Sequence, residues 1–273
     1  MRIRTALTAA AASAAAVVTL AMPVPASAAG PDMVLVPAGQ QQPFFVTRGS
    51  PASASSEDGR SPSIEVPAFL MDRTPVTRRQ FAEFVREQAE WRRSQMTPVL
   101  ADPHYLEDWA SDLGAGKSVP ADAPVTRVSW FAASAYCQWK GKELPTVDQW
   151  ERAAAGGGKD AAATRDKILR WYSRPGTEPL RAVGREAPNA YGLHDLHGLI
   201  WEWTLDFNST LVSTENRDSG AKDDPLFCGS GSQGAADPGD YATFMRYALR
   251  NSLKASYTTG TLGFRCAKEM ERP

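Results

Sequence analysis

Two short helices are predicted by residues 129–156, SWFAASAYCQWKGKELPTVDQWERAAAG. The first ends at Gly141, a residue type suited to the left-handed conformation that closes a helix. The second begins with a capping box, in which Thr146 caps backbone N–H groups and Gln149 reaches back to the cap. This helix stops at Gly156. Apolar residues recur at helical spacing in both segments, so we expect each helix to bury one face.

Extended segments and one more helix are predicted upstream of this stretch. Residues 34–36 and 64–71 are apolar runs typical of strands. Thr77 and Gln80 form another capping box ahead of an apolar helical face. Downstream of Gly156 the helical signals disappear, and short apolar runs alternate with residues that favour turns. We therefore expect one α+β domain with few helices, short antiparallel strands and much irregular backbone.

The N-terminal segment, residues 1–29, has the pattern of a signal peptide. Two arginines near the start are followed by a mostly apolar run at 6–22 and by small residues at 26–28. We expect cleavage near Ala28 or Ala29. The alternative is a membrane anchor, but the most apolar part is short and alanine-rich, whereas a span needs about 20 apolar residues. The mature protein is therefore predicted to be periplasmic or secreted, where disulfides persist.

The composition excludes several classes of protein. The chain has 273 residues, with 30 Lys and Arg against 31 Asp and Glu, so its formal net charge is -1 and we expect no nucleic-acid partner. Hydrophobic residues make up 42%, which is enough for a core. The sequence lacks a nucleotide-binding glycine loop, a His-Glu-x-x-His motif and a Gly-x-Ser-x-Gly motif. We also expect no membrane span in the mature chain, residues 30–273.

Three cysteines and three histidines leave few options for metal binding. An odd number of cysteines in an exported chain indicates one disulfide and one remaining thiol, and composition does not choose among the pairings of Cys137, Cys228 and Cys266. His194 and His197 lie three residues apart, but no dense set of carboxylates accompanies them. We interpret them as loop histidines that make ordinary hydrogen bonds, and we predict no metal site.

Six segments, in order and over nearly the whole mature chain, resemble the formylglycine-generating enzyme (sulfatase-modifying factor) domain family. Each segment is weak evidence alone, and their shared order makes the resemblance specific. The segments are Met33-Val-Leu-Val-Pro-Ala-Gly39, 69–85, 124–130, 135–151 with Ala135-Tyr-Cys-Gln-Trp139 and Leu144-Pro-Thr146, 189–206 with Trp201-Glu-Trp-Thr204, and 246–266 with Arg246, Arg250 and Gly263-Phe-Arg-Cys266.

The resemblance implies a fold and a disulfide. The family has a single irregular domain, related to C-type lectin folds, with little regular secondary structure. We expect residues 30–273 to adopt it. The family's disulfide maps onto Cys137 and Cys266, which leaves Cys228 as the remaining thiol.

Departures from the family pattern bear on its cofactors. Formylglycine generators bind Cu(I) through two cysteines, and soft thiolates suit that ion. Those positions map onto Asp237 and Ala242, so we expect no formylglycine production by the two-cysteine copper mechanism. Leu199 replaces an asparagine that helps to bind a structural Ca2+ in the family, although Glu202 remains. We therefore predict that the copper and calcium sites are degraded.

Two functions remain open after these departures. One is an exported protein, an oxidoreductase of the formylglycine-generating enzyme superfamily, that carries out or assists oxidative maturation of a protein or a secreted metabolite. The other is a non-catalytic binding module on the lectin-like scaffold. The candidate catalytic residues are Cys228, Glu202, Arg246 and Arg250, and the candidate substrate-binding residues are Trp201 and His194.

Each catalytic candidate also has a structural alternative. Arg246 and Arg250 are suited to holding an anionic group, but we favour the alternative that they form salt bridges that stabilise the fold. Cys228 is either a reactive thiol with a lowered pKa or an inert one. Glu202 lies between two tryptophans in the sequence and would, in its structural role, anchor backbone amides.

Overall fold

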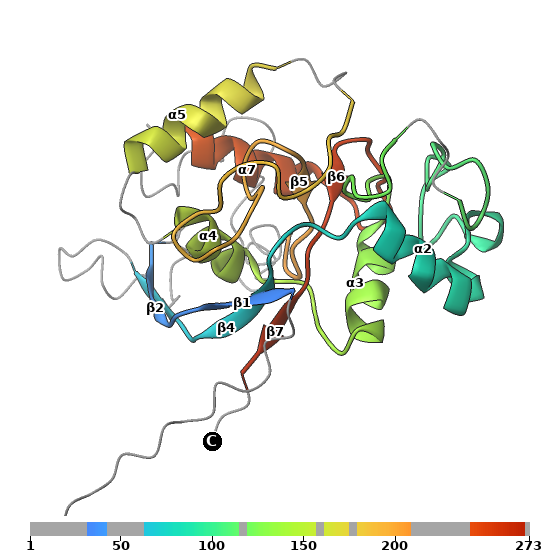
Figure 1. Cartoon of the computed structure of the whole chain (residues 1–273), viewed down its shortest axis with the longest axis horizontal. Coiled ribbons are helices and arrows are strands. Elements are labelled where there is room, and N and C mark those ends of the chain that lie inside the picture. Colours follow the sequence, from blue (N-terminus) through green and yellow to red (C-terminus); the bar gives the residue numbers. More distant parts are fainter. Residues whose placement is uncertain are drawn as a thin grey trace, which may run out of the picture.

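A computed structural model describes residues 32–42, 63–114, 119–156, 161–174, 179–208 and 241–270 (Figure 1). In this view α2 and α3 lie on one side of the central β5–β6 pair, and α4, α5 and α7 lie on the other. The elements in chain order are β1 (Met33–Val36), β2 (Gly39–Gln41), β3 (Ile64–Val66), β4 (Phe69–Asp72), α2 (Arg78–Glu87), η1 (Ala89–Trp91), η2 (Arg93–Gln95), α3 (Trp130–Trp139), α4 (Val147–Ala155), α5 (Ala161–Tyr172), β5 (Trp201–Glu202), α7 (Tyr241–Ser252), β6 (Leu262–Gly263) and β7 (Ala267–Glu269).

The predicted strands form two small antiparallel sheets. Strand β4 lies between β1 and β7, with Leu70 opposite Leu35 and Met71 opposite Ala267. Strand β3 pairs with β2. The predicted extended segment 64–71 is divided into β3 and β4 at Pro67, which has no backbone N–H to donate to a ladder. The described residues therefore confirm the predicted strands.

The predicted helix ends are also confirmed. Both capping boxes are present, at Thr77 before α2 and at Thr146 before α4. Gly141 and Gly156 have φ values of 66° and 58°, so each adopts the left-handed conformation expected after a helix. Local sequence is sufficient at these positions because a cap bonds only to backbone groups within its own turn.

An aromatic core joins α2 and α3 to the C-terminal segment. The Phe81 ring centroid lies 5.8 Å from that of Tyr136 and 6.2 Å from that of Phe264. Cys137 and Cys266, both fully buried, form the disulfide that the family resemblance implied. The C-terminal strand is thus tied to α3 by packing and by a covalent bond.

A second core cluster holds α4 against the sheet and so positions the site described below. Trp150 and Ala153 of α4 pack with Phe69 and Met71 of β4. Helix α4 also contacts β2 and β3. The opposite face of α4 is thereby directed toward α7 (Figure 1).

The prediction of no helix after Gly156 is wrong. Helix α7 buries Ala242, Arg246, Tyr247 and Arg250 on one face. The two arginines interrupt the apolar periodicity of that face, so the pattern does not resemble an amphipathic helix even though the spacing is helical. The two arginines are buried because they pair with a carboxylate from another part of the chain, so the helix cannot be recognised from its own apolar periodicity.

Helix α5 also contradicts the prediction of no helix after Gly156, and the physical reason is different. It buries Ile168, whereas many of its other residues are exposed. An apolar stripe is therefore nearly absent from its sequence. The helix contacts α7 and lies beside it in Figure 1.

Strand direction is a further correction. Strands β5 and β6 pair in parallel, with Trp201 opposite Leu262 and Glu202 opposite Gly263, whereas antiparallel strands were predicted. Parallel neighbours need a long connection, and about 60 residues of chain separate these two strands. Local turn signals carry no information about such a pairing.

Among the helices in the described ranges, none is long and apolar enough to cross a membrane.

Candidate functional site

Within the described residues, a hollow opens between α4, α5, α7 and the β5–β6 pair. Its walls are mostly apolar and include four leucines and one isoleucine. The side chains leave room for about one water molecule in it. The other lining residues are Trp150, Trp171, Trp201, Glu202, Arg246 and Arg250.

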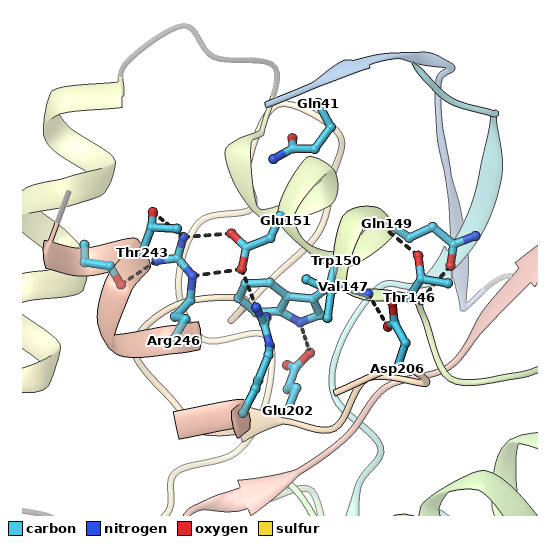
Figure 2. Close-up of polar contacts among 12 residues, drawn as sticks. Gln41, Thr146, Val147, Gln149, Trp150, Glu151, Glu202, Asp206, Thr243 and Arg246 are labelled. Atoms are coloured by element: carbon cyan, nitrogen blue, oxygen red, sulfur yellow. Dashed lines mark hydrogen bonds and ion pairs between the residues drawn. The ribbon is translucent and has the colours of Figure 1, made fainter. Parts of the chain in front are cut away.

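Glu151 of α4 is held between two arginines of α7 (Figure 2). Arg246 donates from Nε and Nη2 to the two carboxylate oxygens at 3.1 and 2.7 Å, and Arg250 donates from Nη1 to Oε1 at 2.7 Å. All three side chains are buried. Burial by itself would raise the pKa of Glu151, but Arg246 and Arg250 hold that pKa at about 2. The arginines therefore form the salt bridges that were the alternative to a catalytic role.

The two arginines use their donors unequally. Besides binding Glu151, Arg246 donates to the Ala242 carbonyl at 3.1 Å and to Thr243 Oγ1 at 3.0 Å. Arg250 makes one hydrogen bond within the described part of the chain, to Glu151. Its guanidinium carbon lies 5.0 Å from the Trp150 ring centroid. Among the described residues, Arg246 thus makes four hydrogen bonds and Arg250 makes one.

Glu202 joins this cluster to the C-terminal strand. It accepts from Trp150 Nε1 at 2.7 Å and from Arg265 Nε and Nη2, both at 2.8 Å. Arg265 and the Glu202 side chain are fully buried. Both carboxylate oxygens are therefore engaged. Glu202 orients the Trp150 ring at the hollow, and its structural partners are side chains rather than the backbone amides predicted.

Three aromatic rings form one wall beside the hollow. The Trp201 ring centroid lies 4.8 Å from that of Trp171 and 5.0 Å from that of Tyr172. Each of the three residues is half-buried, so the rings keep some exposed surface. The Tyr172 hydroxyl donates to the Ala242 carbonyl at 3.1 Å, which ties the end of α5 to the start of α7.

Two aspartates lie at the beginning of α4, and Figure 2 shows one of them, Asp206, at the first turn. Asp206 accepts from the backbone N–H of Val147 at 2.7 Å and so caps the first turn. Burial raises the pKa of Asp148 to about 6, and the nearby Asp206 and Glu151 carboxylates add to this effect. Arg250 opposes it.

The two histidines after Asn189 serve the backbone and the core. His194 Nδ1 lies 2.7 Å from the Glu186 carbonyl, and the His194 carbonyl accepts from Arg265 Nη2 at 2.9 Å. His197 is buried against Trp150, and burial followed by the Arg246 charge lowers its pKa to about 3. His194 does not line the hollow, and its role in substrate binding stays a prediction.

The structure brings four of the predicted residues together. Trp201, Glu202, Arg246 and Arg250 line the same hollow, although their segments are about 40 residues apart in the sequence. Cys228 lies outside the described residues, so the prediction about its thiol remains as it was.

The described residues do not fit the copper site of the family. Cu(I) needs soft thiolates. Cys137 and Cys266 are buried in a disulfide, and Ala242 presents a methyl group on the buried face of α7. Within the described ranges, no group of three His, Cys, Asp or Glu side chains is arranged to hold a metal ion. Cys228 and Asp237 lie outside those ranges, so loss of the copper site stays a prediction.

Two described residues bear on the calcium site of the family. Glu202 binds the Arg265 guanidinium through both oxygens, so a calcium ion there would face a fixed positive charge. Leu199 offers no side-chain oxygen. These two residues do not fit a calcium site, and its loss also stays a prediction.

Sequence reasoning missed three residues of the site. Glu151 was placed in a helix without a role, and neither Trp150 nor Tyr172 was expected near Arg250. One signal was available for Glu151: two arginines spaced four apart can lie on one helical face, and burial of that face would require an acidic partner. The identity of the partner, 95 and 99 residues away, had no local signal.

Comparison with known proteins gives a consistent match. The family model for the sulfatase-modifying factor enzyme 1-like domain matches residues 18–270. The formylglycine-generating enzyme of Thermomonospora curvata is 30% identical over 288 residues, which covers 87% of this chain and 93% of that protein. The inactive C-alpha-formylglycine-generating enzyme 2 of Mus musculus is 29% identical and covers 89% and 87% of the two chains.

Two further matches are more distant or partial. The hercynine oxygenase of Mycolicibacterium smegmatis is 30% identical over 210 residues, which is 67% of this chain and 48% of that protein. Among solved structures, PvdO from Pseudomonas aeruginosa aligns with a TM-score of 0.46 and 20% identity, covering 87% of this chain and 94% of that one.

Proposed function

Because the chain belongs to the sulfatase-modifying factor enzyme 1-like domain family, we propose that it is an exported member that carries out or assists oxidative maturation of a protein or a secreted metabolite. The hollow at Arg250 is the single observation that carries this proposal. It combines an aromatic wall with a buried guanidinium that makes one hydrogen bond to the described part of the chain. Such a pairing of apolar surface and a few placed polar groups is typical of small-molecule sites.

The oxidative class rests on relatives. A formylglycine-generating enzyme and a hercynine oxygenase are among the similar proteins, and the name of the second describes oxidative chemistry. The route that we expect differs from a two-thiolate copper centre, because Ala242 carries no sulfur. In this proposal the described residues bind and orient the substrate. Arg250 holds its charge, and Trp201 holds its apolar part.

A non-catalytic binding module is the second candidate, and one observation favours it. Both oxygens of Glu151 and of Glu202 are engaged by arginines, so neither carboxylate is poised as a general base. A relative at 29% identity is also named as an inactive enzyme.

An oxygen-consumption assay separates the two candidates. Purified protein is incubated with cysteine peptides and with products of neighbouring genes, with and without added Cu(I), while oxygen uptake and substrate mass are recorded. We expect oxygen-dependent change in the mass of one candidate substrate, no aldehyde from a cysteine peptide and no stoichiometric copper. Stoichiometric copper with aldehyde formation would restore the two-cysteine mechanism. No oxygen uptake with any candidate would favour the binding module.

A further inference from the structure

Arg250 is a buried guanidinium whose donors are largely unused. Its side chain is 6% exposed and makes one hydrogen bond, to Glu151, within the described residues. Buried donors are normally satisfied, because leaving one without a partner costs free energy. Several fully buried side-chain atoms of the described residues have no hydrogen-bond partner. None belongs to Arg250, so its remaining N–H groups keep access to space, and the hollow is the space that Arg250 lines.

The hollow also carries an excess of positive charge among the groups that line or touch it. Arg246 and Arg250 share one carboxylate, that of Glu151, so within the described ranges one guanidinium charge has no second carboxylate in an ion pair. Glu202 does not compensate it, because Arg265 neutralises Glu202. Asp148, at the start of α4, offsets part of the charge when ionised, but it does not line the hollow. An anion in the hollow would meet donors and a matching charge.

The aromatic wall determines which kind of anion fits. Trp171 and Trp201 line the hollow and keep exposed ring surface. Flat rings stack favourably on such surfaces. Because the hollow itself has room for about one water molecule, a single carboxylate oxygen fits it, and the rest of the ligand stays outside. The body of the ligand would then lie against the two indole rings.

We infer that the hollow binds small aromatic carboxylates, with the carboxylate on Arg250 and the ring against Trp171 and Trp201. The inference names the substrate class for the site of the proposed function. It rests on that function for the oxidative step alone, because binding is measurable without turnover. Arg250 is the residue that selects the charge, and the two tryptophans select the flat body.

Calorimetric titration of the full-length protein tests the inference. The ligands are 3-phenylpropionate, its neutral amide, and acetate, which has the charge without the ring. We expect 3-phenylpropionate to bind about tenfold more tightly than the amide, because a hydrogen bond to a charged group is lost with the amide. Acetate should bind more weakly than 3-phenylpropionate as well. Equal affinity for the acid and the amide, or no detectable binding of the acid, would overturn the inference.

Variants locate the site. Arg250→Gln should weaken binding of 3-phenylpropionate about tenfold and bring it close to that of the amide. Arg79→Gln removes the same charge from an exposed ion pair with Asp122 and should leave the affinity unchanged. Unchanged affinity in a folded Arg250→Gln would overturn the inference. If that variant does not fold, Trp201→Leu is titrated with the same ligands. Unchanged affinity of Trp201→Leu for 3-phenylpropionate, with the preference over the amide retained, would place the ligand elsewhere and overturn the inference.

Binding and turnover can fail separately. Tight binding of 3-phenylpropionate without oxygen uptake by any candidate supports the site and counts against oxidative maturation. Oxygen-dependent turnover of a substrate together with no carboxylate binding supports the proposed function and overturns the site.

Discussion

At the scale of single residues, Asp148 occupies an unfavourable environment at the start of α4. Burial, followed by the Asp206 and Glu151 carboxylates, raises its pKa from 3.8 to about 6. An acid whose pKa is raised on folding stabilises the fold only while it is protonated. That contribution is present below about pH 4 and is lost as the pH rises through about 6.

Asp148→Asn should therefore stabilise the protein at neutral pH. We expect a gain on the order of 2 kcal/mol at pH 7 to 8 and almost no difference at pH 4, measured by urea unfolding across the range. Asp166→Asn, at an exposed position on α5, changes the net charge equally and serves as the control. Parallel stability profiles for Asp148→Asn and the unchanged protein would contradict the assignment.

Glu151 is the residue whose loss should cost the most. It is the shared partner of two buried arginines, and removing it leaves both charges without compensation. Removing one partner of a buried ion pair typically costs about 3 to 5 kcal/mol. We expect Glu151→Gln to lose about that much in chemical unfolding, while Glu87→Gln, on an exposed position at the end of α2, should change stability little. A small effect at Glu151 would show that the arginines find other partners.

At the scale of elements, α4 is held at its first turn by groups close in sequence and by one distant group. Thr146 Oγ1 accepts from the Gln149 N–H at 3.1 Å, and Gln149 Oε1 accepts from the Thr146 N–H at 2.9 Å. Asp206 binds the Val147 N–H. Because α4 presents Trp150 to the hollow and Glu151 to the two arginines of α7, these caps also set the geometry of the site (Figure 2).

Thr146→Ala should destabilise the protein by about 1 kcal/mol, the usual cost of losing a helix cap. Thr146→Ser keeps the hydroxyl and should cost much less. Thermal unfolding of both variants measures the difference, with ligand titration as a second readout for α4. Equal melting temperatures for the alanine and serine variants would show that the capping box contributes nothing to stability.

At the scale of the whole molecule, the disulfide closes about half of the chain into one loop. Cys137 and Cys266 are separated by 129 residues, and such a loop is worth about 5 kcal/mol in the chain-entropy model. The bond also fixes the C-terminal segment that carries Arg265, and Arg265 binds Glu202 at the hollow. The covalent tie and the site are therefore connected through adjacent residues.

Peptide mapping without reductant should recover a Cys137–Cys266 peptide, with Cys228 as a free thiol. Replacement of both Cys137 and Cys266 by alanine should lower the free energy of unfolding by about 4 to 5 kcal/mol. Cys228→Ser is the matched control and should leave the unfolding midpoint nearly unchanged. Free thiols at Cys137 and Cys266 in the native protein would contradict the pairing.

Much of the fold could be predicted wherever the determining contacts are local. The caps at Thr77 and Thr146 and the helix stops at Gly141 and Gly156 act within one turn, and all four are confirmed. Helix α7 could not be predicted in this way. Its buried face includes two arginines, and their burial makes physical sense only with a carboxylate from α4.

The candidate site shows the same division. The family resemblance, which depends on six segments in the same order, identifies four site residues: Trp201, Glu202, Arg246 and Arg250. The fold brings these four residues to one hollow. The unequal roles of the two arginines could not be read from spacing, because both occupy the same helical face. The difference lies in the acceptors. Arg246 donates to Glu151, Ala242 and Thr243, whereas Arg250 donates to Glu151.

By itself, the sequence determined the family, the disulfide pair implied by that family, and the ends of three helices, since caps and ordered motifs are written in neighbouring residues. Only the tertiary structure decided the parallel β5–β6 pairing, the existence of α7 as a helix, and the availability of Arg250. Each of these depends on partners far along the chain, because a buried charge is stable only where another segment brings the opposite charge to it.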